Sequence, residues 1–274
     1  MKNKIIFVLA TGLLLGCQPG GNFSLREKGD QSDNQTMTPP LPAPGPSSTL
    51  TQNQKIAGVS VGKDDEDDVQ EEGMLIPTIY YTPLIEEGPQ TCPGDEKVPL
   101  LNSRNETLIT VCPKTEAACA LQGTCYITQN GRMRRFNLSG SFEADSKGSH
   151  HFMEMINSEC RFGLGVQDIC LDPFYSVAAD LSHYHPGDVI YIPDVKGVML
   201  PDGTRHSGYF VVRDDGPRIT GKGRFDFYTG FLNWTSPLNP LAKKKLADPA
   251  TRMPYAVVTG PRAEEARRER NFPK

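Results

Sequence analysis

Carboxylates are concentrated in one stretch of the sequence, directly after a run of residues typical of a strand. The run His206–Val212 is rich in aromatic and β-branched residues, a composition that favours a strand. Two adjacent carboxylates, Asp214 and Asp215, follow it, and a loop rich in glycine leads away from them. We expect these residues to belong to a cluster of acidic side chains around which the rest of the chain is organised.

A third carboxylate of this cluster, Asp226, lies inside the next predicted strand, Arg224–Tyr228. Two phenylalanines alternate with Asp226, so its side chain is expected on the opposite face of the strand. Aspartate disfavours strands, and a charge beside an apolar core is costly unless it is paired or neutralised. Two interpretations stay open: a structural ion pair with a nearby arginine (Arg213 or Arg224), or a carboxyl group with a raised pKa at the rim of a groove, which would be a candidate acid.

A further aspartate, Asp180, lies earlier in the chain and, like Asp214, follows an apolar strand. The stretch Ser176–Pro193 reads as an apolar strand that ends near Asp180, a turn at His185–Asp188 and a second strand, VIYIP. The sequence therefore places one more acidic side chain, that of Asp180, next to the end of a strand.

The elements that must position these side chains are mainly short strands. Many short strands separated by turn signals, with one or two helix candidates, predict an all-β, barrel-like domain. The pair Asn130-Gly131 predicts a hairpin, and Asn239 is expected to cap a short helix. Six aromatic side chains would suit stacking on sugar rings, although each one alone is more typical of a core: Tyr80, Tyr81, Tyr184, Tyr209, Tyr228 and Trp234.

The order of these motifs resembles a known family. The chain carries DLSHYHPGD from Asp180, DDGPRITG from Asp214 and GRFD ending at Asp226. This order is similar to that of the three-aspartate (3D) domain of bacterial cell-wall enzymes, which is shared by the membrane-bound lytic transglycosylase A family and by muralytic stationary-phase survival proteins. The resemblance covers about residues 177–230, with a weaker echo at Ile76–Pro83. It implies a double-psi β-barrel.

The resemblance also implies an activity and roles for single residues. It implies a peptidoglycan lytic transglycosylase, a lyase in which one carboxyl group serves as acid and then as base. Asp226 would take that role, Asp214 would hold a negative charge near the reacting centre and raise the pKa of Asp226, and Asp180 would complete the cluster. Secondary candidates for substrate binding are Asp215, Thr220, Lys222, Arg224 and Tyr228.

The chain departs from the family pattern in the loop after Asp214. Asp215 replaces a threonine, Pro217 replaces a glycine and Thr220 replaces a lysine, while one extra residue precedes Asp226. Lys222 is the candidate for supplying the missing cation.

The N-terminal residues predict export and lipidation. Lys2 and Lys4 precede an apolar run, Ile5–Leu15, and the sequence Leu14-Leu15-Gly16-Cys17 has the form of a lipobox. Residues 1–17 are therefore expected to be a lipoprotein signal peptide, with Cys17 as the lipidated residue that anchors the protein to a membrane. Gln18 after the cysteine implies, by analogy with enterobacterial lipoproteins, the periplasmic side of the outer membrane.

The remaining chain divides into a linker, a folded domain and a tail. Residues 18–73 are rich in proline, serine and acidic residues, and we expect a disordered linker. The folded domain is expected at 74–262, with a cysteine-rich insertion at about 90–172 and a charged tail at 263–274. The net charge of −4 gives no support to nucleic-acid binding.

The cysteines agree with export into an oxidising compartment. Apart from Cys17, an even number remains, which favours disulfide bonds and leaves their pairing open. These residues are Cys92, Cys112, Cys119, Cys125, Cys160 and Cys170. No Cys-x-x-Cys motif points to zinc, and the pair His183 and His185 lacks a third ligand, so these two histidines are expected at the surface or lining a groove. We therefore expect neither a metal nor another cofactor.

Two functions from other classes stay open beside the enzyme. The domain could bind peptidoglycan without cleaving it, since the loop after Asp214 departs from the family pattern. It could also be a structural outer-membrane lipoprotein, in which the aspartates merely pair with arginines. Fold alone does not decide among them, because function belongs to the site.

Overall fold

The computed structural model describes residues 69–273, apart from residues 90, 93–95, 141–143 and 147. The expected signal peptide, the lipidated Cys17 and all but the last residues of the expected linker lie outside the described residues. Within the described part of the chain, no helix is both long enough and apolar enough to cross a membrane.

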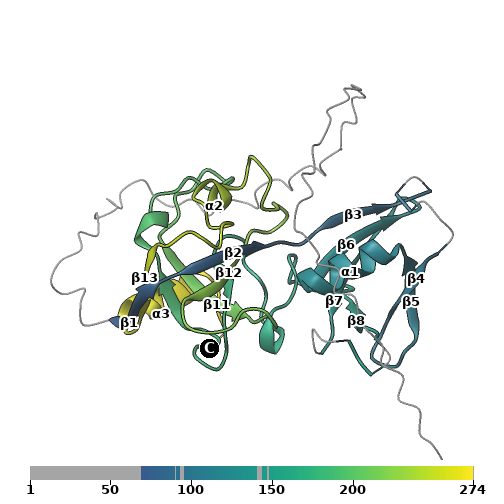
Figure 1. Cartoon of the computed structure of the whole chain (residues 1–274), viewed down its shortest axis with the longest axis horizontal. Coiled ribbons are helices and arrows are strands. Elements are labelled where there is room, and N and C mark those ends of the chain that lie inside the picture. Colours follow the sequence, from purple (N-terminus) through teal and green to yellow (C-terminus); the bar gives the residue numbers. More distant parts are fainter. Residues whose placement is uncertain (1–68, 90, 93–95, 141–143, 147, 274) are drawn as a thin grey trace, which may run out of the picture. The chain divides into compact units, whose positions relative to one another are not determined.

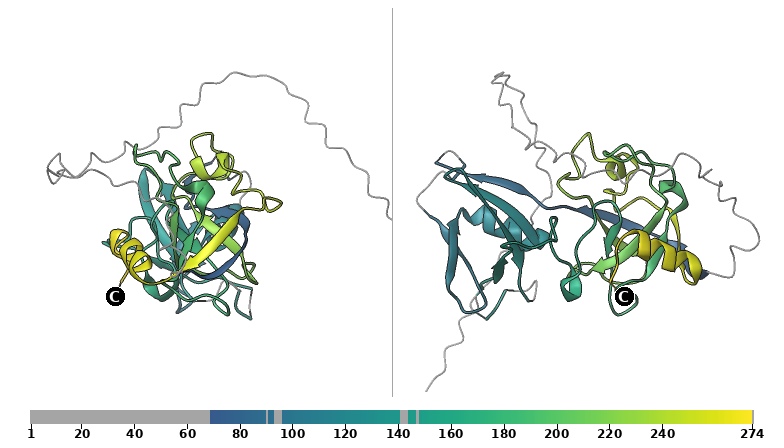
Figure 2. Two further views of the ribbon diagram at one scale, coloured as in Figure 1. Left: turned by 90° about the vertical axis from the view of Figure 1, so that its left-hand side faces the viewer. Right: turned by 180° about the vertical axis from the view of Figure 1, so that it is seen from behind.

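The larger sheet contains seven strands in the order β1-β13-β10-β11-β9-β12-β2. Its strands are β1 (Val69–Met74), β2 (Ile76–Tyr80), β9 (Ser176–Ala178), β10 (Val189–Tyr191), β11 (Tyr209–Asp214), β12 (Arg224–Tyr228) and β13 (Pro254–Val258). The pairs β11–β9 and β12–β2 are parallel, and the other pairs are antiparallel. Figures 1 and 2 show these strands curled around a common interior.

The sheet closes on itself because its two edges are consecutive pieces of chain. Strand β1 pairs with β13, strand β2 pairs with β12, and only Leu75 separates β1 from β2. The N–H of Leu75 donates to the carbonyl of Met253 at 2.9 Å, and the N–H of Ile76 donates to the carbonyl of Gly223 at 2.7 Å. The expected all-β, barrel-like domain is thereby confirmed, and the mixed pairing agrees with the double-psi barrel that the resemblance implies.

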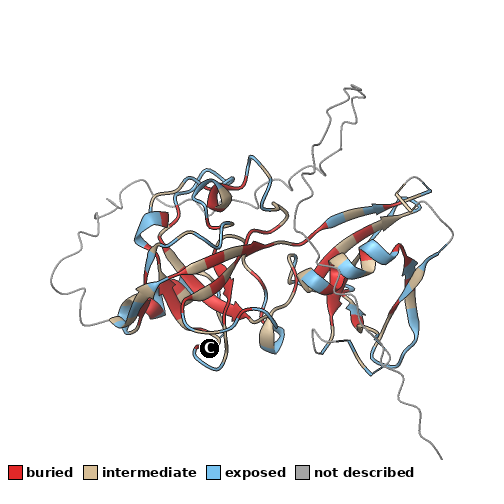
Figure 3. Ribbon diagram, viewed as in Figure 1, coloured by how far each residue is buried: buried red, intermediate tan, exposed pale blue. Residues whose placement is uncertain are grey.

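Side chains that point into the core alternate along strand β12 with side chains on its other face. Phe225 and Phe227 of β12 are fully buried in the largest apolar cluster, together with Phe210 of β11. Asp226, between the two phenylalanines, is only partly buried on the other face of β12. The expected orientation of Asp226 is confirmed, and Figure 3 shows the buried interior of the barrel in red.

Between β2 and β9 the chain builds an insertion with a sheet of its own, in the order β3-β6-β7-β8, and a two-stranded ladder of β4 and β5. Its elements are β3 (Leu84–Glu87), β4 (Val98–Leu101), β5 (Thr107–Val111), α1 (Pro113–Gln122), β6 (Thr124–Gln129), β7 (Arg132–Leu138), β8 (Phe152–Glu154) and the 3-10 helix η2 (Val166–Asp168). The insertion begins at Leu84, ahead of the expected residue 90, because β3 pairs with β6.

All six expected cysteines form disulfide bonds, which confirms the expectation and resolves the pairing. The bonds are Cys92–Cys112, Cys119–Cys125 and Cys160–Cys170. Each joins cysteines that are neighbours in the order of the chain. Cys119 and Cys125 lie in the apolar core of the insertion, so this bond ties α1 to β6.

Two elements lie across boundaries expected from the sequence. Strand β1 begins at Val69, inside the stretch expected to be linker, because its backbone pairs with β13. The tail contains helix α3 (Pro261–Glu269), whose Ala263 and Ala266 are buried in an apolar cluster with residues of β10, β11 and β13. The 3-10 helix η3 (Pro193–Val195) and the short helix α2 (Pro240–Lys243) complete the elements, and the Asn239 side chain caps α2 as expected.

Candidate active site

Asp214 and Asp226 lie in one cross-strand row of the barrel, on either side of Ala178. Ala178 of β9 pairs with Asp214 of β11 and with Asp226 of β12, and Asp226 pairs in turn with Thr78 of β2. Directly opposed residues on neighbouring strands present their side chains to the same face of the sheet. Two strand spacings place the backbones of the two aspartates about 10 Å apart. Ala178, whose small side chain is buried in a cluster with Tyr80 and Ile219, separates the two aspartates.

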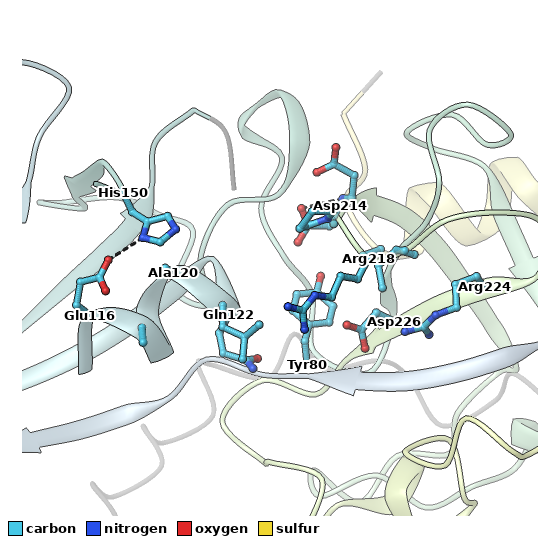
Figure 4. Close-up of a pocket in the computed structure, with 16 residues that line it drawn as sticks. Tyr80, Glu116, Ala120, Gln122, His150, Asp214, Arg218, Arg224 and Asp226 are labelled. Carbon is cyan, nitrogen blue, oxygen red and sulfur yellow. Dashed lines mark hydrogen bonds and ion pairs between the residues drawn. The ribbon is translucent and has the colours of Figure 1, made fainter. Parts of the chain in front are cut away.

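The row borders a pocket of about 430 Å³ (Figure 4). The barrel contributes Tyr80, Ala178, Arg224, Asp226 and the stretch 214–219, and the insertion contributes Glu116, Ala117, Ala120, Leu121, Gln122 and His150. The two carboxyl groups therefore face a wall formed by α1 and the loop before β8. Such a concave site with converging polar groups is the usual setting of a binding or active site.

The carboxyl group of Asp226 is held by a short chain of hydrogen bonds. The Thr78 hydroxyl donates to Asp226 Oδ1 at 2.8 Å, and Arg224 Nη1 donates to the same hydroxyl oxygen at 2.8 Å. Burial raises the pKa of Asp226 to about 6, although the Thr78 hydrogen bond and the charge of Arg224 both lower it. A carboxyl group that titrates near pH 6 can hold its proton at mildly acidic pH and release it during a reaction, as a general acid must.

Asp214 is more deeply buried, and its pKa is displaced further. Only 8% of the residue is exposed, and burial raises its pKa from 3.8 to about 8. The Tyr80 hydroxyl and the N–H of Asp215 lower this pKa, whereas the charges of Asp215 and Asp226 raise it. The surroundings therefore favour a neutral Asp214 at pH 7, instead of the negative charge expected from the sequence.

The ion-pair interpretation of Asp226 is not realised among the described residues. Arg224 reaches Asp226 only through the Thr78 hydroxyl and also donates to backbone carbonyls. Arg213 is buried elsewhere and donates to the carbonyls of Cys170 and Arg270. The carboxyl group of Asp226 thus remains available to the pocket.

Asp180 does not line the pocket and is bound to the loop beside it. Its Oδ2 accepts a hydrogen bond from the N–H of Gly221 at 2.6 Å, and its Oδ1 accepts from the N–H and hydroxyl of Ser182. The Gly221 hydrogen bond and those from Ser182 lower the pKa of Asp180 to about 2. A carboxylate that stays ionised can hold this loop, but it is no proton donor at neutral pH.

The secondary candidates separate into two groups. Asp215 and Arg224 line the pocket, and burial raises the pKa of Asp215. Lys222 instead pairs with Glu71 of β1 at 2.6 Å, and Thr220 lies outside the pocket lining. Tyr228 is buried outside the pocket lining, and its hydroxyl donates to the Phe162 carbonyl at 2.9 Å.

Sequence reasoning missed most of the second wall. Glu116, Gln122 and His150 of the insertion line the pocket without having been expected there, as does Arg218 of the barrel loop. His183 and His185 are exposed, in agreement with the surface position expected for them, and lie outside the pocket lining. His150 Nδ1 lies 2.7 Å from Glu116 Oε1. No local signal identifies Glu116, Gln122 and His150, because they reach the aspartates only through the packing of the insertion against the barrel. Arg218 instead lies in the same loop as Asp214, four residues further along the chain.

One group of described residues has the composition of a metal site, but its atoms form a disulfide bond and hydrogen bonds instead. Oxygen and sulfur atoms of Glu87, Cys92 and Cys112 lie within 4.8 Å of one another. The two cysteines form a disulfide bond, and Glu87 accepts hydrogen bonds from the N–H of Cys112 and the hydroxyl of Thr115. The carboxylate of Glu87 thus satisfies groups at the start of α1.

Comparison with known proteins supports the resemblance found in the sequence. The family model of the 3D domain matches residues 175–234, which include all three aspartates, so the expected resemblance over residues 177–230 is confirmed. No curated protein matches the chain in sequence.

Three solved structures show a looser similarity. Escherichia coli MltA with bound chitohexaose is 16% identical over 68% of this chain and 72% of that one, with a TM-score of 0.46. A membrane-bound lytic murein transglycosylase from Agrobacterium tumefaciens is 15% identical over 74% of this chain and 79% of that one, with a TM-score of 0.44. The lytic transglycosylase LtgG of Burkholderia pseudomallei is 16% identical over 68% and 70%, with a TM-score of 0.34.

Proposed function

We propose that this protein is a peptidoglycan lytic transglycosylase. It would cleave the β-1,4 bond between N-acetylmuramic acid and N-acetylglucosamine and leave a 1,6-anhydro ring on the muramic acid. The observation that carries this proposal is the pair Asp214 and Asp226. The two residues lie in one cross-strand row that borders the pocket, burial raises the pKa of both, and both fall within the matched 3D domain.

The proposed reaction needs one carboxyl group that first gives a proton and then takes one. Protonated Asp226 donates its proton to the glycosidic oxygen as the bond to C1 breaks. The resulting carboxylate accepts the proton of the C6 hydroxyl as that oxygen bonds to C1. The carboxyl group is thereby regenerated, and no water is consumed.

Asp214 would assist Asp226 as a neutral neighbour. A second negative charge in the row would oppose the formation of the Asp226 carboxylate, because like charges in a buried site repel strongly. A protonated Asp214 avoids that repulsion and offers a hydrogen-bond donor to the substrate. Arg224 and Thr78 would stabilise the Asp226 carboxylate once its proton has left, by the hydrogen bonds that they already make.

Turnover of purified sacculi by single variants tests these roles. Asp226→Asn should reduce the rate by about 10²- to 10⁴-fold, the usual contribution of a general acid. Asp214→Asn should retain most of the activity, because asparagine imitates a neutral carboxyl group. Asp194→Asn, an exposed residue of η3 outside the pocket, is the matched control. An Asp226→Asn variant as active as the control would refute the assignment.

The same proposal includes an anchor and a location. We propose that Cys17 carries the lipid, that residues 18–68 form part of the linker, and that the domain faces the periplasm from the outer membrane. This proposal rests on the lipobox and on the composition of the linker. Metabolic labelling with a palmitate analogue should label the protein in cells, and Cys17→Ala should abolish the label.

A second candidate function is a wall-binding or structural lipoprotein without catalysis. It is favoured by the altered loop after Asp214 and by Lys222, which is paired with Glu71 instead of facing the pocket. This alternative predicts that the protein sediments with sacculi and releases no soluble fragments. The turnover assay above separates it from the enzyme.

A further inference from the structure

The loop between Asp214 and β12 is fixed to the barrel at several points. Ile219 is buried in a cluster with Tyr80 and Ala178, and its N–H donates to the Gly216 carbonyl at 2.9 Å. Further along, the N–H of Gly221 donates to Asp180. The backbone on the C-terminal side of Arg218 is therefore held in place.

Arg218 precedes the buried Ile219, is itself exposed and lines the pocket. Figure 4 shows it extended along the pocket toward Tyr80 and Gln122. The part of the pocket wall formed by α1 includes two small residues, Ala117 and Ala120. The fixed loop thus presents a long cation to an open space.

Among the described residues, Arg218 is the pocket cation that makes no hydrogen bond and no ion pair. The other pocket arginine, Arg224, donates to Thr78 and to two carbonyls. Glu116, the carboxylate of the facing wall, pairs with His150 at 2.7 Å. A guanidinium group has five donors arranged to bind a carboxylate, and here the protein uses none of them.

We propose that Arg218 binds a carboxylate carried by the glycan and so gives the site a preference for strands that contain muramic acid. The proposal rests on the proposed function. Muramic acid differs from glucosamine by a lactyl ether, whose carboxyl group is free in glycan without peptide and is linked to a peptide with carboxylates of its own in intact wall. An oligomer of N-acetylglucosamine offers no carboxylate at all. Arg218 would therefore determine specificity, while Asp226 performs the chemistry.

Binding measurements test the preference without turnover. The full chain carrying Asp226→Asn is titrated with three probes: glycan strands freed of peptide by an amidase, strands with intact peptides, and N-acetylglucosamine hexamer. Arg218→Gln should weaken binding of at least one acidic probe by about tenfold or more, since charge-assisted hydrogen bonds are the strong ones. Whichever acidic probe loses affinity identifies the source of the carboxylate. Binding of the neutral hexamer should not change.

Two further variants sharpen the result. Arg218→Lys should recover part of the lost affinity, because lysine keeps the charge but not the paired donors. Arg252→Gln removes an exposed arginine of the barrel outside the pocket and should change nothing. In the chain with Asp226 intact, Arg218→Gln should raise KM for strands that carry the carboxylate and leave kcat nearly unchanged.

The inference and the proposed function fail in different ways. Equal loss of affinity for all three probes, or no loss for any, would overturn the role of Arg218 and leave the enzyme proposal intact. Failure of every probe to bind any form of the protein would overturn both.

Discussion

Asp226 and Asp214 stand on opposite sides of Ala178 in a single cross-strand row, and burial raises the pKa of both carboxyl groups. The two groups nevertheless differ. Asp226 is partly exposed to the pocket and titrates near pH 6, whereas Asp214 is buried and titrates near pH 8. Below pH 6 both carboxyl groups are largely protonated, which is the state that the proposed general acid needs, and between pH 6 and pH 8 Asp226 is largely ionised while Asp214 stays largely neutral.

The rate of glycan cleavage should fall above pH 6. The active form carries the proton on Asp226, and burial raises the pKa of this group to about 6. The value of kcat/KM should therefore be nearly constant below this pH and decrease about tenfold for each pH unit above it. The measurement is a pH profile with soluble glycan strands as substrate. A rate that rises from pH 6 to pH 8 would mean that an ionised carboxylate does the work.

Asp214→Asn should make the protein more stable at alkaline pH. Since the pKa of Asp214 is raised from 3.8 to about 8, folding keeps a proton that the unfolded chain would release. The native state is therefore progressively destabilised as the pH rises from about 4 to about 8. One pKa unit corresponds to about 1.4 kcal/mol, so the effect is on the order of a few kcal/mol.

Denaturant unfolding at two pH values measures this effect. The difference in free energy of unfolding between Asp214→Asn and the unsubstituted protein should shift by a few kcal/mol in favour of the variant from pH 3.5 to pH 8. Asp194→Asn, whose carboxylate is exposed, should show no such shift. Equal differences at both pH values would show that Asp214 titrates normally.

Asp180→Ala should loosen the loop that carries Arg218. The substitution removes the acceptor for the Gly221 N–H, which now lies 2.6 Å from Asp180 Oδ2. Hydrogen exchange at Gly221 should become faster, and kcat/KM should decrease through a higher KM. Asp180→Asn keeps one side-chain oxygen and should show a smaller change. Undisturbed exchange at Gly221 together with a large loss of kcat would instead place Asp180 in the chemistry.

Local patterns allowed much of the barrel to be predicted. Strand β12 was expected with its observed bounds, Arg224–Tyr228, because Phe225 and Phe227 alternate with the charged residues Arg224 and Asp226. The hairpin at Asn130-Gly131 was also expected, and both residues have the positive φ angles, 52° and 73°, that a tight two-residue turn needs. The aspartates could be identified because they follow or interrupt apolar strands.

Contacts between distant parts of the chain could not be predicted from local sequence patterns. Glu71 and Lys222 are 151 residues apart, and their ion pair keeps Lys222 out of the pocket that it was expected to serve. The acidic composition of β1 suggested linker, yet its backbone pairs with β13 at the other end of the chain. The wall formed by α1 likewise faces Asp226 only because the insertion packs there. The charge states of the aspartates depend on this burial.

The mass of the products released from sacculi tests the central claim most directly. The full chain, with its disulfide bonds intact, is incubated with purified sacculi, and the soluble fragments are analysed by mass spectrometry. We predict muropeptides one water lighter than hydrolysed ones, formed by the unsubstituted protein and missing with Asp226→Asn. Fragments at the mass of hydrolysed muropeptides would contradict the lytic mechanism, and sedimentation with sacculi without any soluble fragment would contradict catalysis altogether.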